Sequence, residues 1–409
     1  MRTFKHSKAT DHLGRYYTES FISRLLVNCL PTQQSGSLLD LGAGEGSLSL
    51  AASGRWPKLD LVTVDVDERA SQVLTSKLRC FGFTGKHQHV QYDALGINLK
   101  QYLNHDLQLQ PILAVCNPPF QIPRWRKGFG EIIEDAGFSS SLPAISTIDA
   151  ALLFLSQNLR LLRSGGTLGI IVPDSLVSAM KYLRFRKTLL EKYDLKRVIR
   201  LPRGCFGGTD ALAYILILSK SRPSSDKVVL STLSSKELFD LSVDRTKGAE
   251  RLDYQYHVAE RITCKATALL SSITLDLCRG SFNSAEVRNS HLFILHTTDI
   301  TSQMRGIWFD FTTMKNDYAV TPCTVAGPGD ILIARVGRNI GDKLIGVSHG
   351  YVAISDCIFR LRVQPEHQMI AMQTLSSATG MEWLRCHAYG VAARHLNKAD
   401  LLKLPLEIV

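Results

Sequence analysis

Short apolar runs alternate with helix-length segments through the first 220 residues of this chain. Each run is apolar on both faces, as a strand must be when helices cover both sides of a parallel sheet. Two of the intervening segments, 150–162 and 176–192, are long enough to be helices. The pattern predicts an α/β fold, a doubly wound Rossmann-like domain. The expected strands are Ser37–Leu41, Leu61–Asp65, Ile112–Cys116, Thr167–Val172, Arg197–Leu201 and Ala213–Leu218.

The chain changes character after residue 220. Segment 219–226 is polar and contains Ser and Pro, which favour turns. We place a boundary after one further short strand, so that the first domain covers residues 1–230 and the second covers residues 231–409. Short β-like runs with Gly-rich turns, such as 327–335, and a helical pattern near 366–379 predict an α+β fold for the second domain.

The composition is that of a folded, basic protein. The 409 residues include 48 Lys plus Arg and 37 Asp plus Glu, which gives a net charge of +11. Hydrophobic residues make up 45%, which excludes wholesale disorder and a mainly membrane-spanning chain. A basic folded chain favours an anionic partner, with nucleic acid as the first candidate. We find no signal peptide and no apolar run of about 20 residues, so we expect no membrane partner.

The cysteines and histidines carry no metal-site pattern. The nine cysteines are scattered, with no Cys-x-x-Cys pair, and the twelve histidines show no spacing typical of zinc ligands. We therefore expect no metal. An odd number of scattered thiols is typical of a reducing compartment, so we expect a cytoplasmic protein.

Three acidic positions lie at the carboxyl ends of expected strands. Asp40 opens the turn Asp-Leu-Gly-Ala-Gly-Glu-Gly over residues 40–46, which differs from both the dinucleotide fingerprint and the phosphate-binding loop. Asp65, 23 residues after Gly42, ends the second strand, where a carboxylate can accept hydrogen bonds from ribose hydroxyls. Asp93 follows the next strand-like stretch and could bind an adenine amino group, although alone it would be read as a turn residue. Together the three positions predict a nucleoside pocket.

The turn after the fourth expected element reads Asn117-Pro118-Pro119-Phe120. Prolines cannot continue a strand ladder, because they lack the amide donor, and they make the turn stiff. A stiff turn suits an Asn side chain and a neighbouring carbonyl that together accept both hydrogens of one amino group. An aromatic ring close by can stack on the planar group held there.

This order of motifs resembles the gamma-class DNA adenine methyltransferases that use S-adenosylmethionine. Residues 117–120 resemble their Asn-Pro-Pro-aromatic motif, and residues 40–44 resemble their cofactor loop. Residues 14–18, which include Tyr17 and Thr18, resemble their N-terminal cofactor motif, although Glu19 stands where the family usually has Pro. Segment 199–206 resembles the late motif that ends in an aromatic residue, here Phe206.

The second half resembles the target-recognition domains of type I specificity subunits and type IIG enzymes. The segments that carry this resemblance are 251–254, 296–300, 329–335 and 390–396. One such domain is present, where a type I specificity subunit has two. The resemblance implies that this domain reads the DNA sequence.

The resemblance also assigns roles to individual residues. Asn117 and Pro118 would hold the amino group of an adenine flipped out of double-stranded DNA, Pro119 would stiffen the turn, and Phe120 and Phe206 would contact the base. Arg124, Arg126 and Lys127 are candidates for contacts to the DNA backbone, with a solvated loop as the alternative. The residues expected to bind S-adenosylmethionine are Tyr17, Thr18, Asp40, Gly42, Ala43, Gly44, Asp65, Val66, Asp93, Ala94 and Asn117.

The implied function is the modification enzyme of a prokaryotic restriction-modification or phage-defence system, associated with the nucleoid. A cognate restriction endonuclease encoded separately is a possible partner, and one recognition domain suggests a monomer or weak dimer. The alternatives are an RNA adenine methyltransferase, a protein glutamine methyltransferase, and a non-catalytic DNA-binding subunit. The intact motif at Asn117 argues against the last of these.

Overall fold

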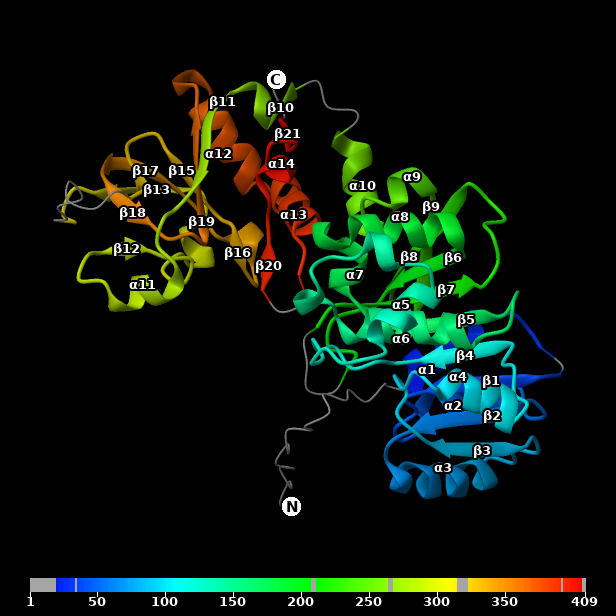
Figure 1. The fold of residues 1–409 in the computed structure, drawn as a ribbon. Helices are drawn as coiled ribbons and strands as arrows, with labels where there is room; N and C mark the ends of the chain where they lie inside the picture. Colours follow the sequence, from blue (N-terminus) through cyan, green and yellow to red (C-terminus); the bar gives the residue numbers. More distant parts are fainter. Residues whose placement is uncertain are drawn as a thin grey trace, which may run out of the picture. The chain divides into compact units, whose positions relative to one another are not determined.

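The computed structural model describes residues 20–33, 35–206, 211–263, 268–314, 323–390 and 393–406. The chain divides into two compact units, Met1–Tyr254 and Gln255–Val409 (Figure 1). The sequence predicts the boundary after residue 230, whereas the first unit of the structure extends to Tyr254. The reason is that two strands after residue 226 complete the sheet of the first unit.

A nine-stranded sheet forms the centre of the first unit. Its strands are β1 (Ser37–Leu41), β2 (Asp60–Asp65), β3 (His87–Gln91), β4 (Leu113–Cys116), β5 (Thr167–Pro173), β6 (Asp194–Arg200), β7 (Ala213–Ser219), β8 (Lys227–Ser234) and β9 (Glu237–Asp244). They lie in the order β3-β2-β1-β4-β5-β7-β6-β8-β9. The first five pair in parallel, so their carboxyl ends share one edge of the sheet. All six expected strands are present.

Helices pack on both faces of this sheet (Figure 1). On one face, Leu26 and Leu74, from two different helices, share a core with Leu113 of β4. On the other face the thiol of Cys116 meets the side chain of Asn158. The helices are α1 (Ser20–Asn28), α2 (Ser47–Arg55), α3 (Glu68–Cys80), α4 (Leu99–Gln101), α5 (Phe129–Asp135), α6 (Ala150–Leu161), α7 (Asp174–Ser178), α8 (Leu183–Lys192) and α9 (Arg245–Gly248).

The helix expected over 176–192 is interrupted. Helix α7 ends at Ser178, because Ala179 adopts an extended backbone with ψ of 138°, and α8 begins at Leu183 after a single 3₁₀ turn. The hydroxyl of Ser178 donates to the carbonyl and carboxylate oxygens of Asp174, both at 2.9 Å, which closes the last turn of α7. Because α7 follows β5 directly and has only 5 residues, the break lies close in the chain to the carboxyl end of β5.

The segment that closes the first unit corrects one sequence assignment. Arg251, Leu252 and Asp253 resemble a recognition domain in sequence, but the structure buries them in the first unit. The backbone N–H of Leu252 donates to the carbonyl of Val177 at 3.1 Å, and Arg200 pairs with Asp253 at 3.5 Å. Buried charges need such partners, so these contacts fix the segment to β6 and α7.

The second unit combines small sheets with helices. Its largest sheet has five strands in the order β11-β19-β15-β17-β13, and a second has three in the order β12-β18-β14. The strands are β10 (Ala268–Leu269), β11 (Thr274–Arg279), β12 (Ile294–Leu295), β13 (Ile307–Phe311), β14 (Val325–Ala326), β15 (Ile331–Ala334), β16 (Val336–Gly337), β17 (Leu344–Gly350), β18 (Val352–Ile354), β19 (Ile358–Val363), β20 (Arg394–His395) and β21 (Pro405–Leu406). The helices are α10 (Tyr254–Thr263), which begins at the boundary, α11 (Ser284–Asn289), α12 (Gln368–Ser376), α13 (Ala378–His387) and α14 (Lys398–Leu401).

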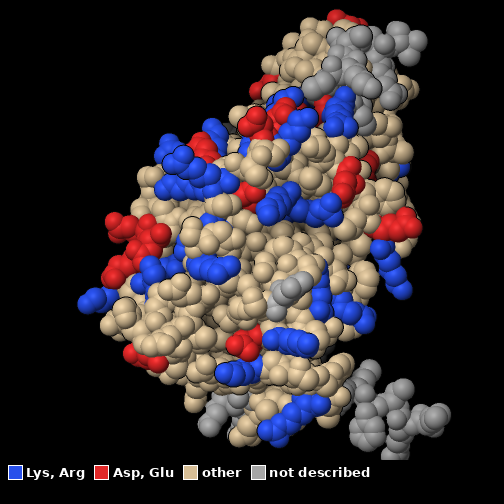
Figure 2. All heavy atoms as spheres, turned by 90° about the vertical axis from the view of Figure 1, so that its right-hand side faces the viewer, with Lys and Arg blue, Asp and Glu red and all other residues tan. Residues whose placement is uncertain are grey.

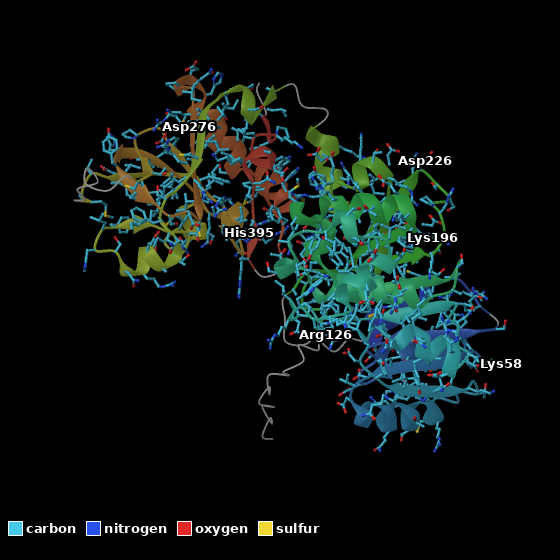
Figure 3. The ribbon with its side chains drawn as sticks, viewed as in Figure 1. Lys58, Arg126, Lys196, Asp226, Asp276 and His395 are labelled. Atoms are coloured by element: carbon cyan, nitrogen blue, oxygen red, sulfur yellow. The ribbon has the colours of Figure 1, made fainter. Side chains whose placement is uncertain are left out.

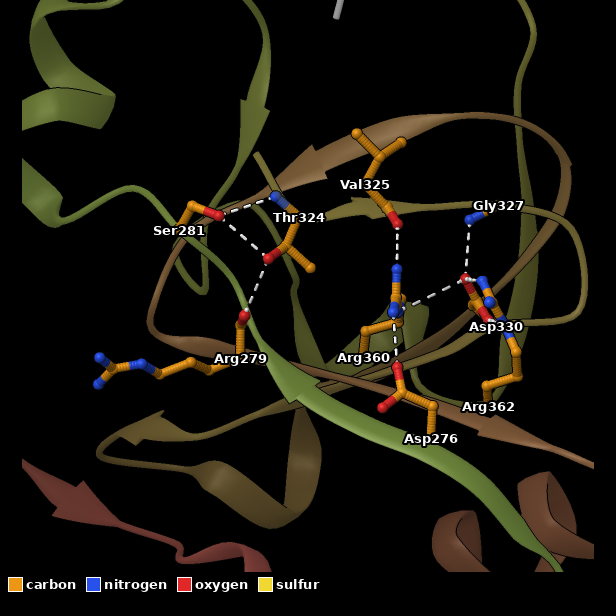
Figure 4. Close-up of polar contacts among 9 residues, drawn as sticks. All are labelled: Asp276, Arg279, Ser281, Thr324, Val325, Gly327, Asp330, Arg360 and Arg362. Carbon is orange, nitrogen blue, oxygen red and sulfur yellow. Dashed lines mark hydrogen bonds and ion pairs between the residues drawn. The ribbon is translucent and has the colours of Figure 1, made fainter. Parts of the chain in front are cut away.

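A buried carboxylate organises the largest sheet of the second unit (Figure 4). Asp330, at the start of β15, is fully buried and accepts two hydrogen bonds from Arg362, at 2.8 and 2.9 Å, and one from the backbone of Gly327 at 2.9 Å. Arg360 pairs with Asp276 at 2.6 Å across β19 and β11. The Gly-Asp segment that the sequence singles out therefore anchors a turn to neighbouring strands.

Candidate active site

The Gly-rich turn links the ends of β1 and β2. The backbone N–H of Gly42 donates to the carbonyl of Val64 at 2.8 Å, and that of Gly44 donates to Oδ2 of Asp65 at 2.7 Å. The other carboxylate oxygen of Asp65 accepts from the N–H of Asp67 at 3.0 Å. Gly44 has φ of +50°, a left-handed backbone that glycine adopts readily, and the space beside it is open. The turn thus presents an oriented carboxylate and an open backbone.

Asp40 is buried behind this turn. Its Oδ2 accepts a hydrogen bond of 2.6 Å from the hydroxyl of Ser49 in α2, a partner that the sequence does not mark. Burial raises the pKa of the Asp40 carboxyl to about 7, and the nearby charge of Asp65 adds to this increase, while the bond from Ser49 opposes it. The Asp40 side chain therefore connects the turn to α2 through Ser49, and its raised pKa means that it titrates near neutral pH.

Asp93 and Ala94 follow β3 at the same edge. One oxygen of Asp93 accepts the N–H of Leu95 at 2.9 Å, and the other forms an ion pair with Arg126. Gln157 of α6 donates to the carbonyl of Ala94 at 3.1 Å and holds the backbone there. The sequence predicts that Arg126 contacts the DNA backbone, and in this structure its guanidinium pairs with the Asp93 carboxylate.

The Asn-Pro-Pro-Phe turn follows β4 directly. Asn117 and Pro119 line the cavity described below, and the carbonyl of Gln121 accepts the N–H of Ala150 at 2.8 Å, which ties the turn to the start of α6. The Phe120 ring meets the Phe206 ring edge-on, with centroids 6.1 Å apart. Both rings pack on the core of the first unit, and Phe206 is only 2% exposed.

These strand ends enclose a cavity of about 740 Å³. The expected site residues that line it are Asp40, Gly42, Ala43, Gly44, Asp65, Val66, Asp93, Ala94, Asn117, Pro119, Arg124 and Arg126. Pro118, Phe120, Lys127 and Phe206 are not among its lining residues. Tyr17 and Thr18 lie outside the described residues.

Three aromatic side chains that line the cavity are missing from the sequence prediction. The Trp125 ring meets the Phe129 ring edge-on, with centroids 5.5 Å apart, and the Arg126 guanidinium lies 4.9 Å from the centre of Phe129. Phe154, on α6, lies beside Gly42. An apolar residue that lines a cavity has the same sequence signature as one in the core, so no pattern marks these three.

The part of the chain that the structure describes contains neither a metal-binding cluster nor a membrane-spanning helix. No cluster of three or more His, Cys, Asp or Glu side chains is arranged to hold a metal ion there. Among the helices in the same described ranges, none could span a lipid bilayer.

Comparisons with known proteins match the first unit to one family. A family model described as N-6 DNA Methylase matches residues 1–246. The chain is 25% identical over 227 residues to the type I restriction enzyme EcoEI methylase subunit of Escherichia coli, covering 54% of this chain and 45% of that protein. It is 24% identical over 206 residues to the type II methyltransferase M.BsuBI of Bacillus subtilis, covering 47% and 40%. The chain thus spans less than half the length of either relative.

A solved structure extends the likeness in fold. The type IIG restriction endonuclease BpuSI superposes with a TM-score of 0.53 and 14% identity, covering 95% of this chain and 57% of that protein. At this identity the match shows the fold alone.

The cavity provides the groups that a charged nucleoside cofactor needs. Asp65 presents a carboxylate held by two backbone N–H groups, Gly44 leaves space beside it, and Trp125 and Phe129 provide apolar surface. These residues fit S-adenosylmethionine, the cofactor expected from the sequence. Because the family model matches more than half of the residues, the chain belongs to the N-6 DNA Methylase family, and its cofactor is S-adenosylmethionine.

Proposed function

We propose that this chain transfers a methyl group from S-adenosylmethionine to the exocyclic amino group of adenine in double-stranded DNA. The observation that carries the proposal is that Asn117 and Pro119 line the same cavity as the acidic ends of β1, β2 and β3. Family membership supports the reaction class, and the two curated relatives are restriction-modification methyltransferases.

The cofactor end of the cavity is assigned to the first three strand ends. Asp65 would accept hydrogen bonds from ribose hydroxyls, because both of its oxygens are already oriented by backbone N–H groups. Asp93 would bind the adenine amino group of the cofactor, and Trp125 and Phe129 would contact its ring. When bound, S-adenosylmethionine supplies a methyl group carried on a positively charged sulfur.

The substrate end is assigned to the turn after β4. The amino nitrogen of adenine is a weak nucleophile, since its lone pair is shared with the ring. The Asn117 side-chain oxygen and the Pro118 carbonyl would accept its two hydrogens and so orient the nitrogen towards the cofactor. Phe120 would stack on the base, and Phe206 would support Phe120 through their edge-on contact. Orientation of this kind can supply about 7–11 kcal/mol of the barrier.

We assign sequence recognition to the second unit, and we place the chain in a restriction-modification or phage-defence system, with a separately encoded endonuclease as a candidate partner. The target adenine would leave the helix to reach Asn117, as bases do for enzymes that modify them. A monomer or weak dimer in the cytoplasm, associated with the nucleoid, fits this role.

The experiment is a methylation assay on several substrates. The chain is incubated with radiolabelled S-adenosylmethionine and either unmethylated genomic DNA, total RNA or a protein extract, and the products are hydrolysed and separated. Label in N6-methyladenine from DNA is the expected result, and Asn117→Ala serves as the control. Label in cytosine, only in RNA, or only in glutamine would overturn the proposal.

A further inference from the structure

Three large apolar side chains are exposed on loops at the carboxyl edge of the sheet. Ile122 is 54% exposed, Ile145 54% and Met180 52%. Ile122 comes two residues after Phe120, and its neighbour Gln121 lines the cavity. We call these three side chains the apolar rim. Exposed aliphatic groups that share one surface near a cavity are typical of a surface that a partner covers.

Hydrogen bonds hold the three loops of the apolar rim together. The carbonyl of Gln121 accepts the N–H of Ala150 at 2.8 Å, which joins the first loop to the second. The carbonyl of Thr147 accepts bonds from Lys181 at 2.8 Å and from Tyr182 at 3.1 Å, which joins the second loop to the third. Each rim residue lies one or two positions from one of these bonded residues, so the loops form one surface.

The surface around the apolar rim is basic. Segments 117–128, 139–149 and 176–184 together contain five Lys or Arg residues and one acid, Asp149. The carboxylate of Asp149 accepts hydrogen bonds from Ser175 at 2.7 Å and Tyr182 at 3.0 Å, and Asp149 is only partly exposed. The exposed cations of these segments are Arg124, Arg126, Lys127, Lys181 and Arg184.

This basic surface differs from another face of the molecule. Arg126 lies on the side of the first unit opposite Lys58 and Lys196 (Figure 3). The face that carries those two lysines has Lys and Arg side chains interspersed with groups of Asp and Glu (Figure 2). Exposed apolar groups on segments that carry five exposed cations, one of which, Arg126, pairs with Asp93, match a duplex, which has phosphates outside and stacked bases inside.

We propose that Ile122 enters the duplex when the target adenine leaves it and packs against the base pairs that border the gap. This inference rests on the proposed function. Pro123 restricts Ile122 to extended backbone, and Gln121 is fixed to α6, so the side chain is held outward on a stiff support. Proteins that unstack duplex DNA insert aliphatic side chains of this kind. Ile145 and Met180 would contact the strand on either side.

The test separates base extrusion from chemistry. Sequencing of genomic DNA methylated by the wild-type protein gives the recognition site, and two duplexes of that site are made, with thymine or with an abasic position opposite the target adenine. An unpaired adenine leaves the stack at lower cost. We expect Ile122→Ala to slow single-turnover methylation of the paired duplex about 10-fold and to approach the wild-type rate on the abasic duplex.

Matched variants complete the design. Val73→Ala, which shortens a β-branched side chain 46% exposed on α3, and the conservative Ile122→Leu should both methylate the paired duplex at the wild-type rate. Ile122→Ala should bind S-adenosylmethionine as the wild type does in calorimetry. The proposal that Ile122 enters the duplex would be refuted by equal rates for Ile122→Ala and wild type on the paired duplex. An equal loss of rate on both duplexes would also refute it.

Two other outcomes are distinct. If Ile122→Ala methylates both duplexes normally but loses binding to a protein subunit purified with the chain, the apolar rim is a protein interface and the inference is wrong. If the wild-type protein methylates neither duplex nor genomic DNA, the proposed function fails, and the inference that rests on it fails with it.

Discussion

The backbone N–H of Gly44 donates a 2.7 Å hydrogen bond to Oδ2 of Asp65, joining the turn after β1 to the end of β2. A second N–H, from Asp67, holds the other oxygen at 3.0 Å. The carboxylate therefore has a fixed orientation before any ligand arrives. Preorganisation of this kind lowers the entropy that binding must overcome.

Asp65→Ala should weaken cofactor binding. Hydrogen bonds to a charged group contribute about 1.5–3 kcal/mol each, so we expect the dissociation constant for S-adenosylmethionine to rise about 10- to 100-fold. Isothermal titration calorimetry measures it. Asp60→Ala, at the opposite end of the same strand, is the control and should bind normally. Similar affinities for both variants would remove Asp65 from the cofactor site.

Asn117→Ala should separate binding from transfer. We expect methylation of DNA to fall at least about 100-fold, the scale of losing one oriented polar group at a reacting centre. Cofactor affinity should stay within about twofold of the wild type, since the assigned cofactor contacts come mainly from β1, β2 and β3. Asn98→Ala, on an exposed loop, should retain full activity. Substantial transfer by Asn117→Ala would show that its side chain does not hold the amino group.

The stability of the first unit should depend on Asp40. Burial raises its pKa from 3.8 to about 7, so between these values the folded chain retains a proton that the unfolded chain loses. The free energy of unfolding therefore falls as pH rises through this window, by about 1.4 kcal/mol per unit at most, and levels off above it. Asp40→Asn cannot titrate, so its stability relative to the wild type should rise from pH 4 to pH 7 in urea denaturation. A pH-independent difference would contradict the raised pKa.

Asp330→Ala should destabilise the second unit. The substitution leaves Arg362 and the N–H of Gly327 without their carboxylate, and we expect a loss of about 2–3 kcal/mol, less than for a wholly buried pair because Arg362 is half exposed. Asp356→Ala removes the 3.6 Å pair with Arg335 and should cost less than about 1 kcal/mol. Thermal unfolding compares the two, and equal losses would mean that the network in Figure 4 contributes no more than an ordinary surface pair.

DNA affinity should fall steeply as salt is added. If several cations around the cavity contact phosphates, the logarithm of the affinity falls linearly with the logarithm of salt concentration, with a slope of about 0.9 per contact. Fluorescence anisotropy of a labelled duplex at several salt concentrations gives the slope. Lys127→Ala should reduce it by about one contact. A flat response would exclude binding through phosphates.

The sequence was sufficient to predict most of the strands of the first unit and the acidic residues at their carboxyl ends. Buried parallel strands are apolar on both faces, so Asp65 and Asp93 stand out as polar residues at their ends. The boundary was harder to predict. The sequence predicts one strand after the polar segment 219–226, but the sheet extends beyond residue 230 through β9, which pairs antiparallel with β8. Only the completed sheet shows that the first unit continues to Tyr254.

The sequence could not predict which rings line the cavity or which charges pair. The sequence motifs predict that Phe120 and Phe206 contact a ligand, but in the structure both rings pack against the core. Phe154, in contrast, lines the cavity although the helix that carries it is buried. Asp93 and Arg126 lie 33 residues apart on two loops, and nothing local to either segment indicates their contact. Such contacts depend on tertiary packing, which composition and periodicity do not encode.

If Asp93 binds the cofactor and Arg126 binds a phosphate of DNA, as proposed, their ion pair couples the binding of the two substrates. A nucleoside that takes the Asp93 carboxylate must release the guanidinium, and a phosphate that attracts the guanidinium must uncover the carboxylate. By linkage, each ligand then raises the affinity for the other by the same factor, at most about fivefold for a half-exposed pair. One arginine would then make the binding of the methyl donor and the binding of the acceptor cooperative.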